Sequence, residues 1–266
     1  MAKLQVLICT IDNGIDKIAK LIPSPSDNIS YLISWQQSNP TCNITTPSEL
    51  LREDINIITL NQLGLSRNRN NALKHATGDI CLIADDDIKL YPLGLEQIIT
   101  TFNQHPDLDL AAFRFHSDSF PKIYPEQSFD LANEPKFYYT SSIEIAFRRN
   151  RILEKGVGFN ELFGIGAPVL NSGEEGIFIV DALRSNLTCL FFPITIAEHN
   201  QATTGIGEPT PQILMSKGAY IYYRYTSHYH IRILRVALGI ALRQKINLCY
   251  ILKYLLNGAN YMKKNG

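Results

Sequence analysis

The last part of the sequence lacks acidic residues. No Asp or Glu follows Glu208, whereas nine Lys and Arg residues do. Because the whole chain has 25 basic and 25 acidic residues, the part up to Glu208 has 16 basic against 25 acidic residues, a net charge of −9. An acidic body with a basic C-terminal segment predicts that this segment meets an anionic surface.

Other features are absent as well. No uncharged apolar run is long enough to span a bilayer, and no basic N-terminal region leads into an apolar run. The five cysteines are scattered without a CxxC pair, so neither a zinc site nor a disulfide framework is indicated. With 45% hydrophobic and 19% charged residues, the chain is predicted to be a globular protein of the reducing cytoplasm.

The segment Ile80–Asp87 organises the rest of the chain. Its apolar residues predict a strand buried on both faces, and three carboxylates, Asp85, Asp86 and Asp87, follow directly. Ligands of open α/β sheets bind at the carboxyl ends of strands, where a divalent metal would relieve the repulsion between these charges. The alternative is an acidic loop that begins the next helix.

Apolar segments alternate with helical patterns along the chain. We expect strands at Leu4–Cys9, Ile29–Ser34, Ile55–Leu60, Leu108–Phe115, Ile143–Phe147 and Leu187–Ile196. Helices are expected at Ile15–Ile22, at 64–78 with Ser66 as N-cap, at Leu93–Phe102 and at Ile177–Leu183. This order predicts an α/β domain with a mostly parallel sheet flanked by helices.

Three segments in this order resemble family 2 glycosyltransferases of the GT-A fold. The first runs from Gly64-Leu65-Ser66-Arg67-Asn68-Arg69-Asn70 through Ala76-Thr77-Gly78-Asp79 to Asp85-Asp86-Asp87, similar to the family's Arg-Asn helix and DXD strand end. The second is Gly158-Phe159-Asn160-Glu161 with Gly173-Glu174-Glu175, and the third is the first strand with Thr10. The resemblance spans about Leu4 to His199 and implies sugar transfer from a nucleotide-diphosphosugar donor.

The resemblance also implies a metal and a base. Asp87 would bind Mn²⁺ or Mg²⁺ directly, and Asp85 and Asp86 would face the donor. His199 would be a further metal ligand or, alternatively, a local hydrogen-bonding or surface residue. Glu175 stands where the family usually has an Asp that takes the acceptor's proton, and Glu174 would lie on the acceptor side. The alternative for both glutamates is that they stabilise a helix N-terminus.

Four further residues are candidates for binding the donor nucleotide. Thr10 and Asp12 follow the first strand, and Arg69 lies in the first turns of a helix, where it would face phosphate or serve packing. Trp35, the only tryptophan, is expected either to stack on the base or to belong to the core. It stands where the family usually has an acidic residue and an Asp-Gly-Ser turn, which leaves the base open.

We expect two parts, a catalytic domain at 1–208 and a basic, Tyr-rich helical extension at 209–266. One amphipathic helix is predicted at Ile231–Leu256. It would lie on an anionic membrane surface, placing the protein peripherally on the cytoplasmic face near a lipid-linked acceptor, or pack on the catalytic domain or a second subunit. We expect no nucleic acid partner, and an oligomer is left open.

The leading hypothesis is therefore a metal-dependent, inverting glycosyltransferase acting on a saccharide or lipid-linked acceptor in bacterial surface polysaccharide synthesis. One alternative is a carbohydrate- or partner-binding relative without turnover. A third, a sugar-nucleotide pyrophosphorylase, would need a Gly-rich loop with Arg and Lys after the first strand, and Thr10-Ile11-Asp12-Asn13-Gly14 is not one.

Overall fold

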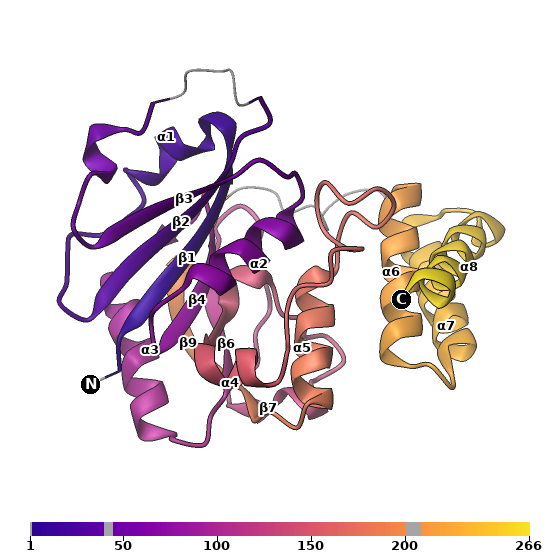
Figure 1. Cartoon of the computed structure of the whole chain (residues 1–266). Helices are drawn as coiled ribbons and strands as arrows, with labels where there is room; N and C mark the ends of the chain where they lie inside the picture. Colours follow the sequence, from indigo (N-terminus) through magenta and orange to yellow (C-terminus); the bar gives the residue numbers. More distant parts are fainter. Residues whose placement is uncertain (1, 40–44, 201–208) are drawn as a thin grey trace. The chain divides into compact units, whose positions relative to one another are not determined.

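The computed structural model describes residues 2–39, 45–200 and 209–266, and within these ranges a single mixed sheet dominates the first part of the chain (Figure 1). Its strands are β1 (Leu4–Ile11), β2 (Ile29–Gln36), β3 (Ile55–Leu60), β4 (Ile80–Asp85), β5 (Lys89–Leu90), β6 (Leu110–His116), β7 (Phe129–Asp130), β8 (Ile145–Arg148) and β9 (Cys189–Glu198). The predicted α/β class with a mostly parallel sheet is confirmed.

The strand order reverses direction between β1 and β4. The order is β3-β2-β1-β4-β8-β6-β9-β5, with β7 paired to β9. Parallel pairings join β1 to β2 and to β4, β2 to β3, and β6 to β9, while β8 runs antiparallel between β4 and β6. The chain thus builds β1, β2 and β3 outward and then returns to the other side of β1, which makes β1/β4 the switch point where α/β sheets bind ligands.

The helices are longer or shorter than their sequence patterns indicated. They are α1 (Ile15–Ile18), α2 (Leu65–His75), α3 (Pro92–Gln104), α4 (Arg149–Glu154), α5 (Glu174–Arg184), α6 (Pro211–Arg224), α7 (Tyr229–Gln244) and α8 (Leu248–Asn265). Short 3-10 turns lie at Asp12–Gly14, Ser48–Leu50, Leu131–Asn133 and Ser142–Glu144. The prediction of Ser66 as N-cap is wrong, because α2 already begins at Leu65 and the Ser66 hydroxyl donates to the Phe163 carbonyl oxygen at 2.6 Å.

The predicted single helix at Ile231–Leu256 is also wrong. Lys245 adopts a left-handed conformation (φ 56°), which ends α7, and the Asn247 side chain accepts from the backbone N–H groups of Cys249 and Tyr250 to begin α8. Helical periodicity continues across the turn, and the sequence pattern alone therefore did not show the break. No helix among the described residues has the length and apolar character needed to cross a membrane.

The chain divides into two compact units. Unit 1 comprises Met1–Leu63, Arg67–Gly158 and Asp181–Ala202, and unit 2 comprises Gly64–Ser66, Phe159–Val180 and Thr203–Gly266. The core of unit 1 contains apolar side chains from the sheet and from α3, such as Val6, Leu82 and Phe102. The predicted division at 208/209 stays a prediction, and residue 208 lies outside the described ranges.

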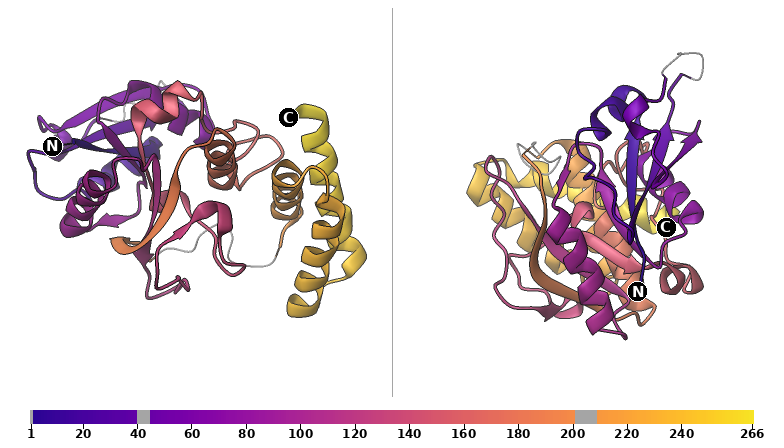
Figure 2. Two further views of the ribbon diagram at one scale, coloured as in Figure 1. Left: turned by 90° about the horizontal axis from the view of Figure 1, so that it is seen from below. Right: turned by 90° about the vertical axis from the view of Figure 1, so that its left-hand side faces the viewer.

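Helices α6, α7 and α8 of unit 2 share an apolar core of their own, and Figure 2 shows them gathered side by side. Two glycines allow α6 and α8 to approach closely. A Cβ on Gly218 would overlap the carbonyl oxygen of Leu255, and a Cβ on Gly258 would overlap that of Met215. At both glycines, α6 and α8 therefore meet backbone against backbone.

Gly218→Ala and Gly258→Ala are each expected to lower the free energy of unfolding by about 1–3 kcal/mol, because backbone cannot yield as a side chain does. Gly239→Ala, within α7, is the matched control: the nearest atom to its Cβ would be 3.7 Å away, and alanine favours a helix by about 1 kcal/mol. Urea denaturation of the three variants measures the difference. Equal midpoints for all three would contradict the close α6–α8 contact.

Candidate active site

The carboxyl ends of β1 and β4 bring Thr10 and the three carboxylates to the same edge of the sheet, because these strands pair in parallel with Cys9 opposite Asp85. All of these residues belong to unit 1. Three carboxylates in succession would repel one another, and the structure gives each of them a different partner. Those partners come from three different parts of the chain.

Asp85 is held by a buried arginine. Nη2 of Arg69 donates to Asp85 Oδ1 at 2.9 Å and to Ser142 Oγ at 2.9 Å. The Arg69 side chain is 1% exposed, whereas that of Asp85 is 34% exposed. Its guanidinium is enclosed in the protein, which fits the packing alternative, and phosphate binding by Arg69 stays a prediction. Arg69 fixes the carboxylate that remains accessible.

Asp86 turns toward the end of β1. The Thr10 hydroxyl donates to Asp86 Oδ2, and Gly14 leaves the space for this bond, since a Cβ there would overlap both side chains. Burial raises the pKa of Asp86, while the Thr10 hydrogen bond opposes the change. Thr10, itself 3% exposed, therefore ties β1 to the acidic turn after β4.

Asp87 meets His199, which follows β9. Asp87 Oδ2 lies 3.4 Å from His199 Nε2, and the hydrogen bond to Asp87 raises the pKa of His199. The imidazole is further held edge-on against Phe115, with 5.9 Å between ring centroids. Asp87 Oδ1 and His199 Nδ1 are both buried without a hydrogen-bond partner. Buried polar atoms of this kind are uncommon and call for a ligand or water.

These two residues fit a metal that is completed by its substrate. Mg²⁺ is often bound through one or two carboxylates together with substrate phosphates, and Mn²⁺ accepts carboxylate and imidazole ligands. Among the described residues no group of three or more His, Cys, Asp or Glu side chains forms a complete metal site. Asp87 and His199 therefore suit a metal that is bound together with a diphosphate, and not one that is held by protein side chains alone.

Asp12 follows β1, and Trp35 lies on β2, which pairs with β1 on the side away from β4. The Asp12 carboxylate accepts from Ser38 N at 2.8 Å and from Ser38 Oγ at 2.7 Å, and these bonds lower the pKa of Asp12. Trp35 is 3% exposed, and its Nε1 donates to the Asp12 carbonyl oxygen at 2.9 Å. Of the two alternatives for Trp35, its burial among the core residues of unit 1 favours the core, and stacking on a base stays a prediction.

Glu174 and Glu175 belong to unit 2 and form the first turn of α5. Glu174 is 6% exposed and lies beside Gly164, whose φ of 99° favours glycine. Glu175 is half-buried. Both acids occupy the position where the helix dipole stabilises negative charge, as the alternative reading of the pair requires.

Sequence reasoning missed two residues of this edge. The Asn68 side chain, 1% exposed, donates to the Thr10 carbonyl oxygen at 3.1 Å, and Ser142 binds Arg69 as described above. Asn68 lies in the Arg67-Asn68-Arg69-Asn70 segment that carries the family resemblance, so that motif carried the signal. Ser142 follows Arg69 by 73 positions, and no local pattern marks it.

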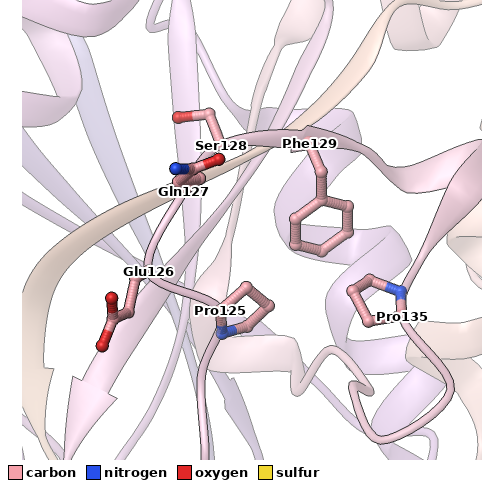
Figure 3. A pocket seen from close by; sticks show the side chains of 6 residues that line it. All are labelled: Pro125, Glu126, Gln127, Ser128, Phe129 and Pro135. Carbon is pink, nitrogen blue, oxygen red and sulfur yellow. The ribbon is translucent and has the colours of Figure 1, made fainter.

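A separate hollow lies around the start of β7, between the loop that precedes this strand and the segment that follows it. It is lined by Pro125, Glu126, Gln127, Ser128, Phe129 and Pro135. The rings of Pro125, Phe129 and Pro135 face one another, and Glu126 and Gln127 extend to the side (Figure 3). None of the predicted site residues lines this hollow, so it is not part of the site at the strand ends.

Residues 44–165 match the family described as Glycosyl transferase family 2. No protein of curated function matches the sequence. Solved structures do resemble the fold. The structure of S. aureus TarS 1-349 matches with a TM-score of 0.61 at 13% identity, covering 98% of this chain and 90% of that one.

Two complexes are also similar. S. aureus TarS 1-349 with UDP-GlcNAc matches with a TM-score of 0.59 at 14% identity, covering 98% of this chain and 90% of that chain. The mannosyltransferase PcManGT from Pyrobaculum calidifontis, in complex with GDP-Man and Mn²⁺, matches with a TM-score of 0.56 at 14% identity, covering 100% of this chain and 76% of that one. The fold is that of the GT-A glycosyltransferases.

Proposed function

We propose that this chain, a member of glycosyl transferase family 2, transfers a sugar from a nucleotide-diphosphosugar to an acceptor hydroxyl. The observation that carries the proposal is the meeting of Asp87 and His199 beside the β1/β4 switch point, each with a buried polar atom that lacks a partner. Such a site suits a metal bound together with the donor's diphosphate. Inversion at the sugar carbon is part of the proposal.

Mn²⁺ or Mg²⁺ would be held by Asp87 and His199. When bound, the metal neutralises the charge that develops on the departing nucleoside diphosphate. Asp85, fixed by Arg69 and partly exposed, is available to the ribose or to a water in the metal's shell. Asp86 and Thr10 act as positioning residues, because each already binds the other.

The nucleotide base stays open within this proposal. TarS is seen with UDP-GlcNAc and PcManGT with GDP-Man, and these two similar folds therefore accept different bases. The carbonyl and carboxylate of Asp12 are both occupied, by Trp35 and Ser38 respectively. We propose that Asp12, with Trp35 and Ser38 bound to it, forms one wall of the pocket for the nucleotide base and does not contact the base directly.

Glu175 is proposed to take the proton from the acceptor hydroxyl, and Glu174 to shape the loop that precedes α5. A sugar hydroxyl attacks poorly until a base removes its proton, a step worth about 10²–10⁴-fold. The half-buried carboxylate of Glu175 suits this role better than that of Glu174, which is 6% exposed. The acceptor class we propose is a glycan or a lipid-linked saccharide of a bacterial surface polysaccharide.

Nucleoside diphosphates are expected to raise the melting temperature only with metal present. A ligand that binds the folded state at 100 times its Kd stabilises it by about 2.7 kcal/mol. Thermal shift with UDP, GDP and the other nucleoside diphosphates, each with Mn²⁺ and with chelator, measures this. If a nucleotide stabilises the protein but no donor is turned over, the protein would instead be a binding protein without catalytic activity. If no nucleoside diphosphate stabilises it, the proposed donor site would be contradicted.

Association with an anionic membrane surface on the cytoplasmic side is part of the proposal, because a lipid-linked acceptor would be reached there. It is supported by the charge of the C-terminal segment, which has nine basic and no acidic residues after Glu208.

A further inference from the structure

Helix α7 has an exposed apolar face in addition to its buried one. Ile233, Ala237 and Ile240 are buried in the core shared with α6 and α8. A second set of apolar side chains is exposed, and we call it the α7 stripe: Ile231 (61% exposed), Leu234 (47%), Leu238 (42%) and Leu242 (80%). An amphipathic helix packed on one core needs only one apolar face, so the second face lacks a partner within this unit.

The α7 stripe is continuous. At 100° per residue, its four members fall within about 80° of one another and point away from the buried face. From Ile231 to Leu242 the stripe is about 16 Å long, at 1.5 Å per residue. Single exposed leucines are ordinary, but aligned exposed apolar residues of this kind mark an interaction surface.

Charges flank the stripe on one side. Arg232, Arg235 and Arg243 lie along one edge of the stripe, and Lys245 is the C-cap residue of α7. No acidic residue occurs anywhere in 209–266 to oppose them. An apolar strip bordered by arginines complements an anionic lipid surface, where acyl chains receive the leucines and phosphates meet the guanidinium groups.

A second copy of the chain fits this stripe less well. In a twofold contact the same patch faces itself, and the centre of the stripe lies between Leu234 and Leu238. Arg235 stands beside that centre, so two copies would bring their Arg235 side chains together without an acid from 209–266 to separate them. Like charges so placed disfavour the contact.

We propose that the α7 stripe, with Arg235 and Arg243, is the surface through which the protein lies on a membrane containing anionic lipid. The helix rests in the plane of the interface, and its buried face stays packed on α6 and α8. This deepens the proposed membrane association and rests on it. Nucleotide thermal shift, measured in parallel, separates a failure of this surface from a failure of the transferase proposal.

The test is flotation of the full chain with vesicles of phosphatidylcholine alone and of phosphatidylcholine mixed with phosphatidylglycerol. Wild type is expected to float with the anionic vesicles and to be released by salt. Leu238→Ser/Leu242→Ser is expected to lower the partition coefficient about tenfold or more. Leu51→Ser/Leu93→Ser, at positions 74% and 73% exposed in unit 1, is the matched control and should float like wild type.

Charge is tested by Arg235→Gln/Arg243→Gln, which is expected to lower binding about fivefold or more. Lys136→Gln/Lys155→Gln, with two exposed lysines of unit 1, is its matched control and should bind like wild type. Circular dichroism confirms that the variants fold. Wild type that stays at the bottom with both vesicles, or stripe variants that float normally, would overturn the proposal. A wild-type dimer that dissociates on Leu238→Ser/Leu242→Ser would also overturn it, by assigning the stripe to a second copy.

Discussion

Asp87→Asn is expected to lower kcat/KM by at least about 10³-fold while leaving the fold intact. A metal that stabilises developing charge contributes several kcal/mol to the transition state, and each 1.36 kcal/mol is tenfold in rate. The amide keeps the size of the carboxylate, and its oxygen can still accept from His199 Nε2, now 3.4 Å from Asp87 Oδ2. Transfer rates over a range of Mn²⁺ concentrations measure the effect.

The ligand-free Asp87→Asn variant should not lose stability together with its activity. Removing one charge from three successive carboxylates relieves repulsion, so the melting temperature should stay the same or rise. The rise produced by nucleotide with Mn²⁺ should disappear. Asp107→Asn, at an exposed position before β6, is the matched control and should keep both activity and the nucleotide response. If Asp87→Asn kept full activity, we would abandon the metal site.

The sequence predicted the sheet because its signal is local. Ile80 to Ala84 is apolar without interruption, as a strand buried on both faces must be, and all five residues are 0% exposed. The acidic triplet then marked the strand end that lies at the switch point. The strand and the acidic residues that end it could therefore be predicted from adjacent residues alone.

The pairing of each of the three acids with its own partner could not be read in this way. It depends on Thr10, Arg69 and His199, which come from three distant parts of the chain. Arg69 shows the difficulty: an arginine near a helix start looks like a phosphate ligand, yet here it is enclosed beside Asp85 and Ser142. Burial of a charge follows from tertiary packing, which no local pattern reports.

The prediction of a single helix in the C-terminal segment was wrong for another reason. Its apolar spacing continued through Ile246, so one long helix fitted the pattern as well as two. The break comes from the backbone of Lys245 and the cap of Asn247. Lysine is not a typical residue for a left-handed turn, so its conformation could not be expected from its type.

Glu175→Gln is expected to lower kcat by about 10²–10⁴-fold with the KM for the donor unchanged. The glutamine cannot accept the acceptor's proton, whereas the donor site in unit 1 is untouched. Steady-state transfer with donor and acceptor varied separately measures both constants. Glu175→Asp shortens the side chain by one methylene and keeps the charge, so it should retain more activity than Glu175→Gln.

The competing explanation, that Glu175 only stabilises the start of α5, gives a different pattern. A carboxylate in the first turn of a helix contributes about 0.3–1 kcal/mol, so Glu175→Gln would lower the melting temperature slightly and leave kcat unchanged. Glu96→Gln, on the exposed side of α3, controls for the loss of an acid elsewhere. Loss of kcat at unchanged stability assigns Glu175 to the chemistry, because a helix cap acts on folding and a base acts only on turnover.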